Sequence, residues 1–238
     1  FDHPLGSRFE EMDAIVFFDD VLVPWERVFL LGDVQLCNNE SDKTSRNIHS
    51  GHQVVTKQVV KVEFILGLAN LMIQTLGSGQ NPQVQQMMAE IIENLVVTKA
   101  CLRAAEVDAE KDEWGVMCPS VTPLRVSRNL FIRMYPRMAE ILHLLGSSSL
   151  MALPTAADIQ GPLATEIETY LDTDTASAEE RIRLFRLAWD TCCSAFASRQ
   201  VLYERYFGGD SARNGVILYG MFDNQPMTDW VRDFLEQE

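Results

Sequence analysis

Residues 44–76 read TSRNIHSGHQVVTKQVVKVEFILGLANLMIQTL, and they carry a long helical pattern of apolar residues. Its apolar residues at 48, 55, 59, 62, 66, 69 and 73 recur at intervals of three, four or seven, which places them on one face of a long helix. The turn from Gly77 to Pro82 ends that helix. Asn81 is a predicted N-cap, and Pro82 suits the first position of a second helix.

Helical patterns of the same kind follow along the chain. A 30-residue helix is about 45 Å long, and the residues from Phe64 to Ile73 are apolar around most of the helix circumference, which is typical of the centre of an oligomer. The predicted fold is therefore all-α, an antiparallel four-helix bundle. Its long helices are expected at 44–76, 82–110, 126–145 (bent near Pro136) and 178–206, with short helices at 212–221 and 228–235.

The first 33 residues differ in kind from the rest. Residues 13–18, DAIVFF, are a β-branched and aromatic run, and Pro24 excludes a helix and suits an edge strand or an extended connector. We therefore predict a short β or extended segment over 1–33 and a helical bundle domain over 34–238.

Composition excludes several classes of function. The 238 residues include 20 Lys and Arg against 34 Asp and Glu, a net charge of −14, which argues against binding to nucleic acid or to an anionic membrane surface. The five cysteines are scattered without a CxxC pair, as in a cytoplasmic protein with reduced thiols. No apolar run is long enough to span a bilayer.

The chain begins at Phe1 in what resembles mid-domain sequence, so we expect it to be a piece of a longer protein.

Two groups of residues are weak candidates for metal or nucleophilic chemistry. His49 and His52 share one helical face but supply only two ligands, so a role at a helix start or subunit contact is favoured over a metal site. Cys192 and Cys193 lie in an apolar helix with no histidine nearby in sequence, which favours packing. We predict no metal site and no catalytic residue on this chain.

Two loops could hold an anion. Gly146, Ser147 and Ser148 offer backbone N–H groups beside hydroxyl donors. The stretch from Phe207 to Arg213 combines Gly208 and Gly209 with the start of a helix, where backbone N–H groups and the helix dipole favour a negative charge. An ordinary helix cap or turn remains the simpler explanation of either loop.

Several strings resemble a known family, the oxygenase components of 4-hydroxyphenylacetate 3-monooxygenase and related phenol hydroxylases. The resemblance covers essentially the whole chain. It is carried by residues 2–8 (DHPLGSR), 13–29 (DAIVFFDDVLVPWERVF), 52–57 (HQVVTK), 63–67 (EFILG), 153–155 (LPT) with Asp158, and 198–207 (SRQVLYERYF).

The resemblance implies an architecture like that of acyl-CoA dehydrogenases. Residues 1–33 would be the end of a middle β domain with its connector, and 34–238 the C-terminal bundle at the centre of a homotetramer, a dimer of dimers. It also implies a cytoplasmic enzyme that hydroxylates a phenol ortho to its hydroxyl group with O2 and reduced FAD supplied by a separate flavin reductase.

The resemblance further implies that this portion contributes to oligomerisation and to part of the FAD site, while the phenol-binding residues lie outside it. The cofactor-binding residues it implies are Phe207, Gly208, Gly209, Asp210 and Arg213. Gly146, Ser147 and Ser148 are implied less strongly, by their match to a glycine-rich cofactor contact of acyl-CoA dehydrogenases. The portion alone is expected to be inactive.

Two alternatives remain open, and a third ranks lower. The chain could be a stand-alone helical oligomerisation module, or an acyl-CoA dehydrogenase-like enzyme, whose catalytic carboxylate would have to come from Glu63, Glu90, Glu93 or Glu168. A 4-hydroxybutyryl-CoA dehydratase is less favoured, because His49 could match a cluster ligand but Thr56 stands near the position where a thiolate would be needed.

Overall fold

The computed structural model describes residues 1–9 and 13–236. Residues 10–12 of the predicted extended segment and the last two residues of the predicted helical domain lie outside the described residues. The elements are α1 (Gly6–Phe9), a 3-10 helix (Trp25–Arg27), α2 (Val34–Lys43), α3 (Arg46–Thr75), α4 (Pro82–Val107), β1 (Glu110–Lys111), β2 (Met117–Cys118), α5 (Val121–Gly146), α6 (Ser148–Met151), α7 (Ala156–Ile159), α8 (Ala164–Leu171), α9 (Ala178–Cys192), α10 (Ala195–Tyr206), α11 (Ser211–Met221) and α12 (Gln225–Leu235).

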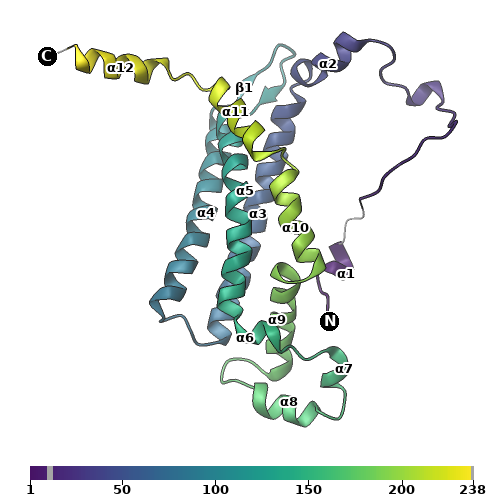
Figure 1. Cartoon of the computed structure of the whole chain (residues 1–238), viewed down its shortest axis with the longest axis vertical. Helices are drawn as coiled ribbons and strands as arrows, with labels where there is room; N and C mark the ends of the chain where they lie inside the picture. Colours follow the sequence, from purple (N-terminus) through teal and green to yellow (C-terminus); the bar gives the residue numbers. More distant parts are fainter. Residues whose placement is uncertain (10–12, 237–238) are drawn as a thin grey trace.

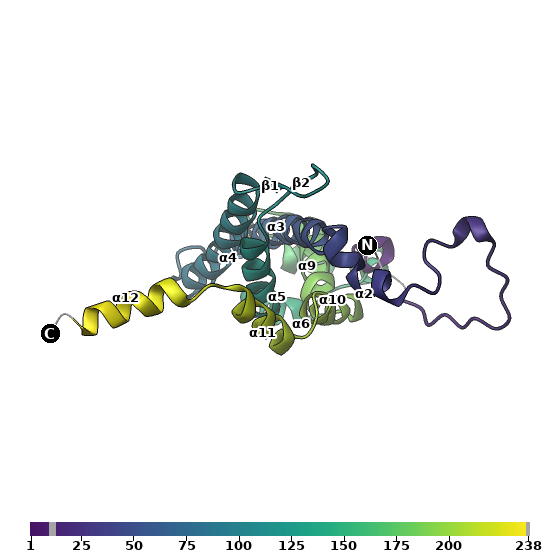
Figure 2. The same cartoon turned by 90° about the horizontal axis from the view of Figure 1, so that it is seen from above.

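Three long helices, α3, α4 and α5, run antiparallel to their chain neighbours and pack side by side (Figure 1). The fourth side of the bundle is formed by α9 and α10, which follow one another along α3 and α5 (Figures 1 and 2). β1 and β2 form a small antiparallel hairpin between α4 and α5. The all-α prediction is confirmed.

The predicted continuous helix over 178–206 is wrong. The chain leaves the helix at Cys193, and Ser194 takes an extended conformation with φ −72° and ψ 173°. The Ser194 side chain then accepts a hydrogen bond from the N–H of Ala197 and caps α10. Serine side chains compete with the helical backbone for hydrogen bonds, which explains the break.

The core is built on a face of α3 that is rotated slightly about the helix axis from the predicted face. Val55, Val59, Val62 and Ala69 are buried as expected, whereas Leu66 and Ile73 are only partly buried. Ile65, Leu68 and Met72 take the central positions and pack against α4, α5 and α9. On α4, the buried residues recur every two turns, at Val84, Ile91, Thr98 and Ala105, which places them on one face of the helix.

Local capping signals give the helix boundaries. The Asn81 side chain accepts a hydrogen bond from the N–H of Gln83 and Pro82 begins α4, as predicted. Ser177 and Glu180 form a reciprocal capping box at the start of α9.

The segment 13–33 forms an arc away from the bundle (Figures 1 and 2). Its only regular element is the 3-10 helix, and no strand is present within this described segment. Ile15, Phe17, Phe18 and Leu22 are exposed there, so the apolar run lacks a partner sheet within the described chain. The domain boundary near residue 33 stays a prediction.

α12 projects from the bundle and makes an amphipathic arm (Figures 1 and 2). Its apolar side chains recur at helical spacing and are exposed: Met227, Trp230, Val231, Phe234 and Leu235. Among the described residues, no helix combines the length and the apolar character that crossing a membrane requires.

Candidate functional site: an arginine-lined anion pocket

The loop from Phe207 to Asp210 joins α10 to α11. Gly209 has φ +96°, a left-handed conformation that side chains other than hydrogen rarely tolerate. The Asp210 side chain accepts a hydrogen bond from the N–H of Arg213 at 3.0 Å and caps α11. The Asn214 side chain donates to the carbonyls of Gly208 and Gly209, which fixes the loop against the first turn of α11.

Two arginines of α5 face this loop. Arg128 donates from Nη2 to the carbonyl of Gly208 at 2.9 Å. The Nε atoms of Arg125 and Arg128 are both buried and have no hydrogen-bond partner among the described residues. Buried guanidinium donors are normally satisfied, so these two atoms point to a missing acceptor.

The arginines and the loop enclose a pocket of about 190 Å³. None of the described residues that line it has a carboxylate side chain, although the chain as a whole carries a net charge of −14. Burial and the nearby charge of Arg125 lower the pKa of Arg128 from its ordinary value. Such a site favours an anion, which would satisfy the donors and offset the repulsion between the cations. The lining residues are Asn47, Arg125, Arg128, Gly208, Gly209, Arg213, Asn214 and Ile217.

A buried charge cluster holds α10 in place one turn before the loop. The carboxylate of Glu204, with 2% of its side chain exposed, accepts hydrogen bonds from Lys57 and Lys61 of α3, each at 2.7 Å. The ammonium group of Lys57 also lies over the rings of Tyr203 and Phe207, which stack with centroids 4.5 Å apart. α3 therefore positions Phe207 and the loop that follows it.

The second predicted loop lies at the other end of α5. Gly146 is 18 residues beyond Arg128, a distance of about 27 Å along the helix axis. Gly146 is buried against Leu150 and Met72, while Ser147 and Ser148 are exposed. The structure thus does not bring the two predicted loops together within one chain.

The two histidines on α3 have different partners. His49 lies 3.5 Å from the thiol of Cys118, and His52 pairs with Glu106 at 3.0 Å. Two of the carboxylates weighed as catalytic are in ion pairs, Glu63 with Lys99 and Glu90 with Arg137. The other two, Glu93 and Glu168, are exposed.

Sequence reasoning missed Arg125 and Arg128. They are three residues apart on α5 and flank its buried positions Leu124 and Ser127. Arginines on the buried face of an amphipathic helix are the signal that could have found them, because buried cations normally have partners.

Comparison with known proteins agrees with the resemblance. Residues 37–236 match the family model described as 4-hydroxyphenylacetate 3-hydroxylase C terminal, and residues 1–30 match the corresponding N-terminal model. The chain is 46% identical over 237 residues to the 4-hydroxyphenylacetate 3-monooxygenase oxygenase component of Thermus thermophilus. It is 40% identical over 238 residues to a probable 4-hydroxyphenylacetate 3-monooxygenase of Bacillus subtilis. Both alignments cover the whole chain and 49% of the relative, so the chain spans about half the length of these relatives.

Solved structures give the same relationship. The oxygenase component HpaB, crystallised with FAD and 4-hydroxyphenylacetate, superposes with a TM-score of 0.93 at 45% identity, over 99% of this chain and 50% of that one. An archaeal 4-hydroxybutyryl-CoA dehydratase shares the fold alone, with a TM-score of 0.80 at 14% identity over 92% of this chain and 43% of that one. The chain therefore belongs to the 4-hydroxyphenylacetate 3-hydroxylase family and corresponds to the C-terminal portion of its relatives.

Proposed function

We propose that this chain is the C-terminal part of the oxygenase component of a two-component flavin-dependent monooxygenase, and that its arginine-lined pocket binds the diphosphate of FAD. The observation that carries the proposal is the pair of buried, unpartnered Nε atoms on Arg125 and Arg128 beside the Gly208–Gly209 turn. A diphosphate supplies the acceptors that these donors lack.

The pocket residues fit such a group. Arg125, Arg128 and Arg213 together supply three guanidinium groups. A Cβ atom on Gly208 would lie 3.3 Å from the Arg128 guanidinium, so glycine keeps the space beside the donors open. Reduced FAD, delivered by a separate reductase, would supply the electrons that activate O2 for hydroxylation of a phenol of the 4-hydroxyphenylacetate class, ortho to its hydroxyl group.

This chain's own share is to bind and position the cofactor. Lys57 and Lys61 hold Glu204, and so hold the helix that carries the loop. We place no catalytic residue on this chain. The groups that contact the phenol belong to the half of the relatives' length that the chain does not span, and residues 1–33 form the end of a preceding β domain.

We further propose a cytoplasmic homo-oligomer, a tetramer built as a dimer of dimers. It is supported by the exposed apolar stripe of α12 and by the exposed apolar side chains Val60, Phe64 and Leu71 on α3. Replacing Trp230 and Phe234 by serine should lower the mass measured by sedimentation, whereas Tyr219→Ser on α11 should not. An unchanged mass in the double variant would exclude α12 from the interface.

The central test is the mass of the natural gene product that contains this chain, followed by reduced-FAD binding and hydroxylation assays on that product and on the 238-residue chain. The proposal is supported if a longer product exists, binds FAD and hydroxylates 4-hydroxyphenylacetate. The 238-residue chain should then be inactive and should bind FAD only weakly. If no longer product exists, the enzyme assignment fails and the alternative of a stand-alone oligomerisation module stands.

A further inference from the structure

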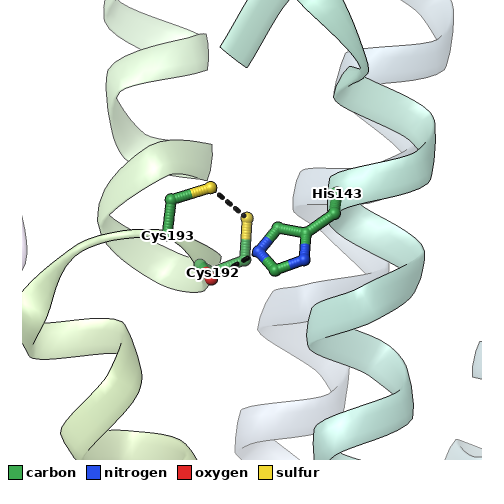
Figure 3. Close-up of side chains that lie close together, drawn as sticks. All are labelled: His143, Cys192 and Cys193. Atoms are coloured by element: carbon green, nitrogen blue, oxygen red, sulfur yellow. Dashed lines mark hydrogen bonds between the residues drawn. The ribbon is translucent and has the colours of Figure 1, made fainter. Parts of the chain in front are cut away.

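The joint between α9 and α10 places two adjacent thiols beside an imidazole of α5 (Figure 3). The Sγ atoms of Cys192 and Cys193 are 3.6 Å apart, and one donor atom each from His143, Cys192 and Cys193 lie within 4.8 Å of one another. His143 is 15 residues beyond Arg128 on α5, about 22 Å along the helix axis. The cluster is therefore separate from the anion pocket.

We propose that His143, Cys192 and Cys193 form a three-donor site for a thiophilic metal ion, such as Zn²⁺ or Cu⁺. The sequence indicates packing for the two cysteines, because no histidine is near them in the chain. The fold supplies that histidine from a different helix, 49 residues away.

The spacing suits a metal ion. Two thiolates on one tetrahedral zinc ion, each at about 2.3 Å from the metal, are about 3.8 Å apart. The two sulfurs thus already have nearly the required separation, and the imidazole has to approach by about 1 Å. The fourth position would be open to solvent, because His143 is exposed and Cys193 is only partly buried.

A disulfide between the two cysteines is less suitable. The Cα atoms of adjacent residues are about 3.8 Å apart across a trans peptide, whereas disulfides ordinarily join Cα atoms separated by about 4.4 Å or more. The pair is therefore better arranged to share a metal ion than to form a bond with each other.

Metal binding would replace existing hydrogen bonds. The Cys192 thiol now donates to the carbonyl of Ala188 at 3.0 Å, and His143 Nε2 donates to the carbonyl of Cys192 at 2.6 Å. Burial raises the pKa of both thiols. Binding as a bis-thiolate therefore releases two protons, and the apparent affinity should rise with pH.

The test is a Zn²⁺ titration of the reduced, metal-free chain against a chromogenic chelator, with Co²⁺ as a spectroscopic probe of thiolate ligation. We expect one Zn²⁺ per chain and a sulfur-to-cobalt charge-transfer band. His143→Gln should weaken Zn²⁺ binding by about tenfold or more, and the double variant C192S/C193S should abolish it and the band.

Two matched controls separate this site from adventitious binding. Cys37→Ser removes an exposed thiol, and His49→Gln removes an imidazole that contacts a single thiol; neither should change the stoichiometry. Because Cys192 is a core residue, His143→Gln and Cys193→Ser provide the test if the double variant is unstable. The proposal would be overturned if His143→Gln and Cys193→Ser bound Zn²⁺ with wild-type affinity. It would also be overturned if the native chain took up no Zn²⁺.

Discussion

The two glycine-containing loops at opposite ends of α5 look alike in sequence and differ in the structure. At the Gly208 end, glycine leaves room beside three arginines that line a pocket. At the Gly146 end, glycine leaves room for Leu150 and Met72, and the space is filled by the core. In both of these loops the glycine allows another group to approach the backbone closely. The residues brought there by other helices decide whether that group is a ligand or a side chain.

Substitutions at the Gly208 end should cause the greatest change. The double variant R125A/R128A should weaken FAD binding by the longer gene product by about a hundredfold or more, since hydrogen bonds to charged groups are worth about 1.5–3 kcal/mol each. Titration calorimetry measures this directly. Arg133→Ala, on an exposed position of the same helix, is the matched control. If both variants bound FAD with equal affinity, the two arginines would not be part of the FAD site.

The next effect is at the Gly146 end. In Gly146→Ala the new Cβ would lie 2.5 Å from two atoms of the buried Leu150 side chain and 3.1 Å from Met72. Overpacking of this kind should lower the free energy of unfolding by about 2 kcal/mol. Urea denaturation should show no comparable loss for Gly208→Ala, whose Cβ meets the end of a flexible arginine. If Gly208→Ala is the more destabilised of the two, the comparison is reversed.

A smaller gain is expected at Ser147. This residue has φ 43° and ψ −131°, a conformation that glycine adopts and serine adopts only under strain. Ser147→Gly should raise the free energy of unfolding by about 1 kcal/mol, measured against Ser148→Gly, which places glycine in α6. Absence of a gain would show that no strain is stored at this end.

The smallest effect is a change in how the free energy of unfolding depends on pH. Hydrogen bonds from the backbone N–H groups of Ser177 and Thr155, and then from their hydroxyls, lower the pKa of Glu180 and Asp158 near the Gly146 end. Because the folded-state pKa values lie below the ordinary values of 4.5 and 3.8, this stabilisation is present above those values and is lost as the pH falls further.

Denaturation at pH 7 and pH 3 should therefore show a smaller loss on acidification for E180Q/D158N than for Glu179→Gln, a control in the same first turn. The same loss in both would exclude the caps as its source.

Much of the fold could be predicted because its signals are local. The spacing of apolar residues in α3 and α4, and the caps at Asn81 and Ser177, depend only on near neighbours in the chain. The break before Ser194 was missed, since a serine inside a periodic pattern can either stay helical or cap a new helix. The arm α12 was predicted as a helix, but the exposure of its apolar side chains was not predicted.

The sites could be predicted only in part. The glycines and Asp210 announce a turn, but the contact of Arg128 with Gly208 joins residues 80 apart in sequence. A local pattern can mark Arg128 as a buried cation that needs a partner, but it does not identify Gly208 as that partner. Resemblance to a family located the loop, and only the packing of α5 against α10 identified the arginines that face it.

The break at Ser194 has a further consequence for how the pocket responds to a ligand. α9 buries seven of its residues, whereas α10 buries only Ala197 and Glu204. Local unfolding of α10 and its loop would therefore remove one wall of the pocket while the core and the arginines of α5 remain ordered. An anion held between both walls would suppress that opening, so occupancy would be reported by slower amide hydrogen exchange in α10 and unchanged exchange in α9.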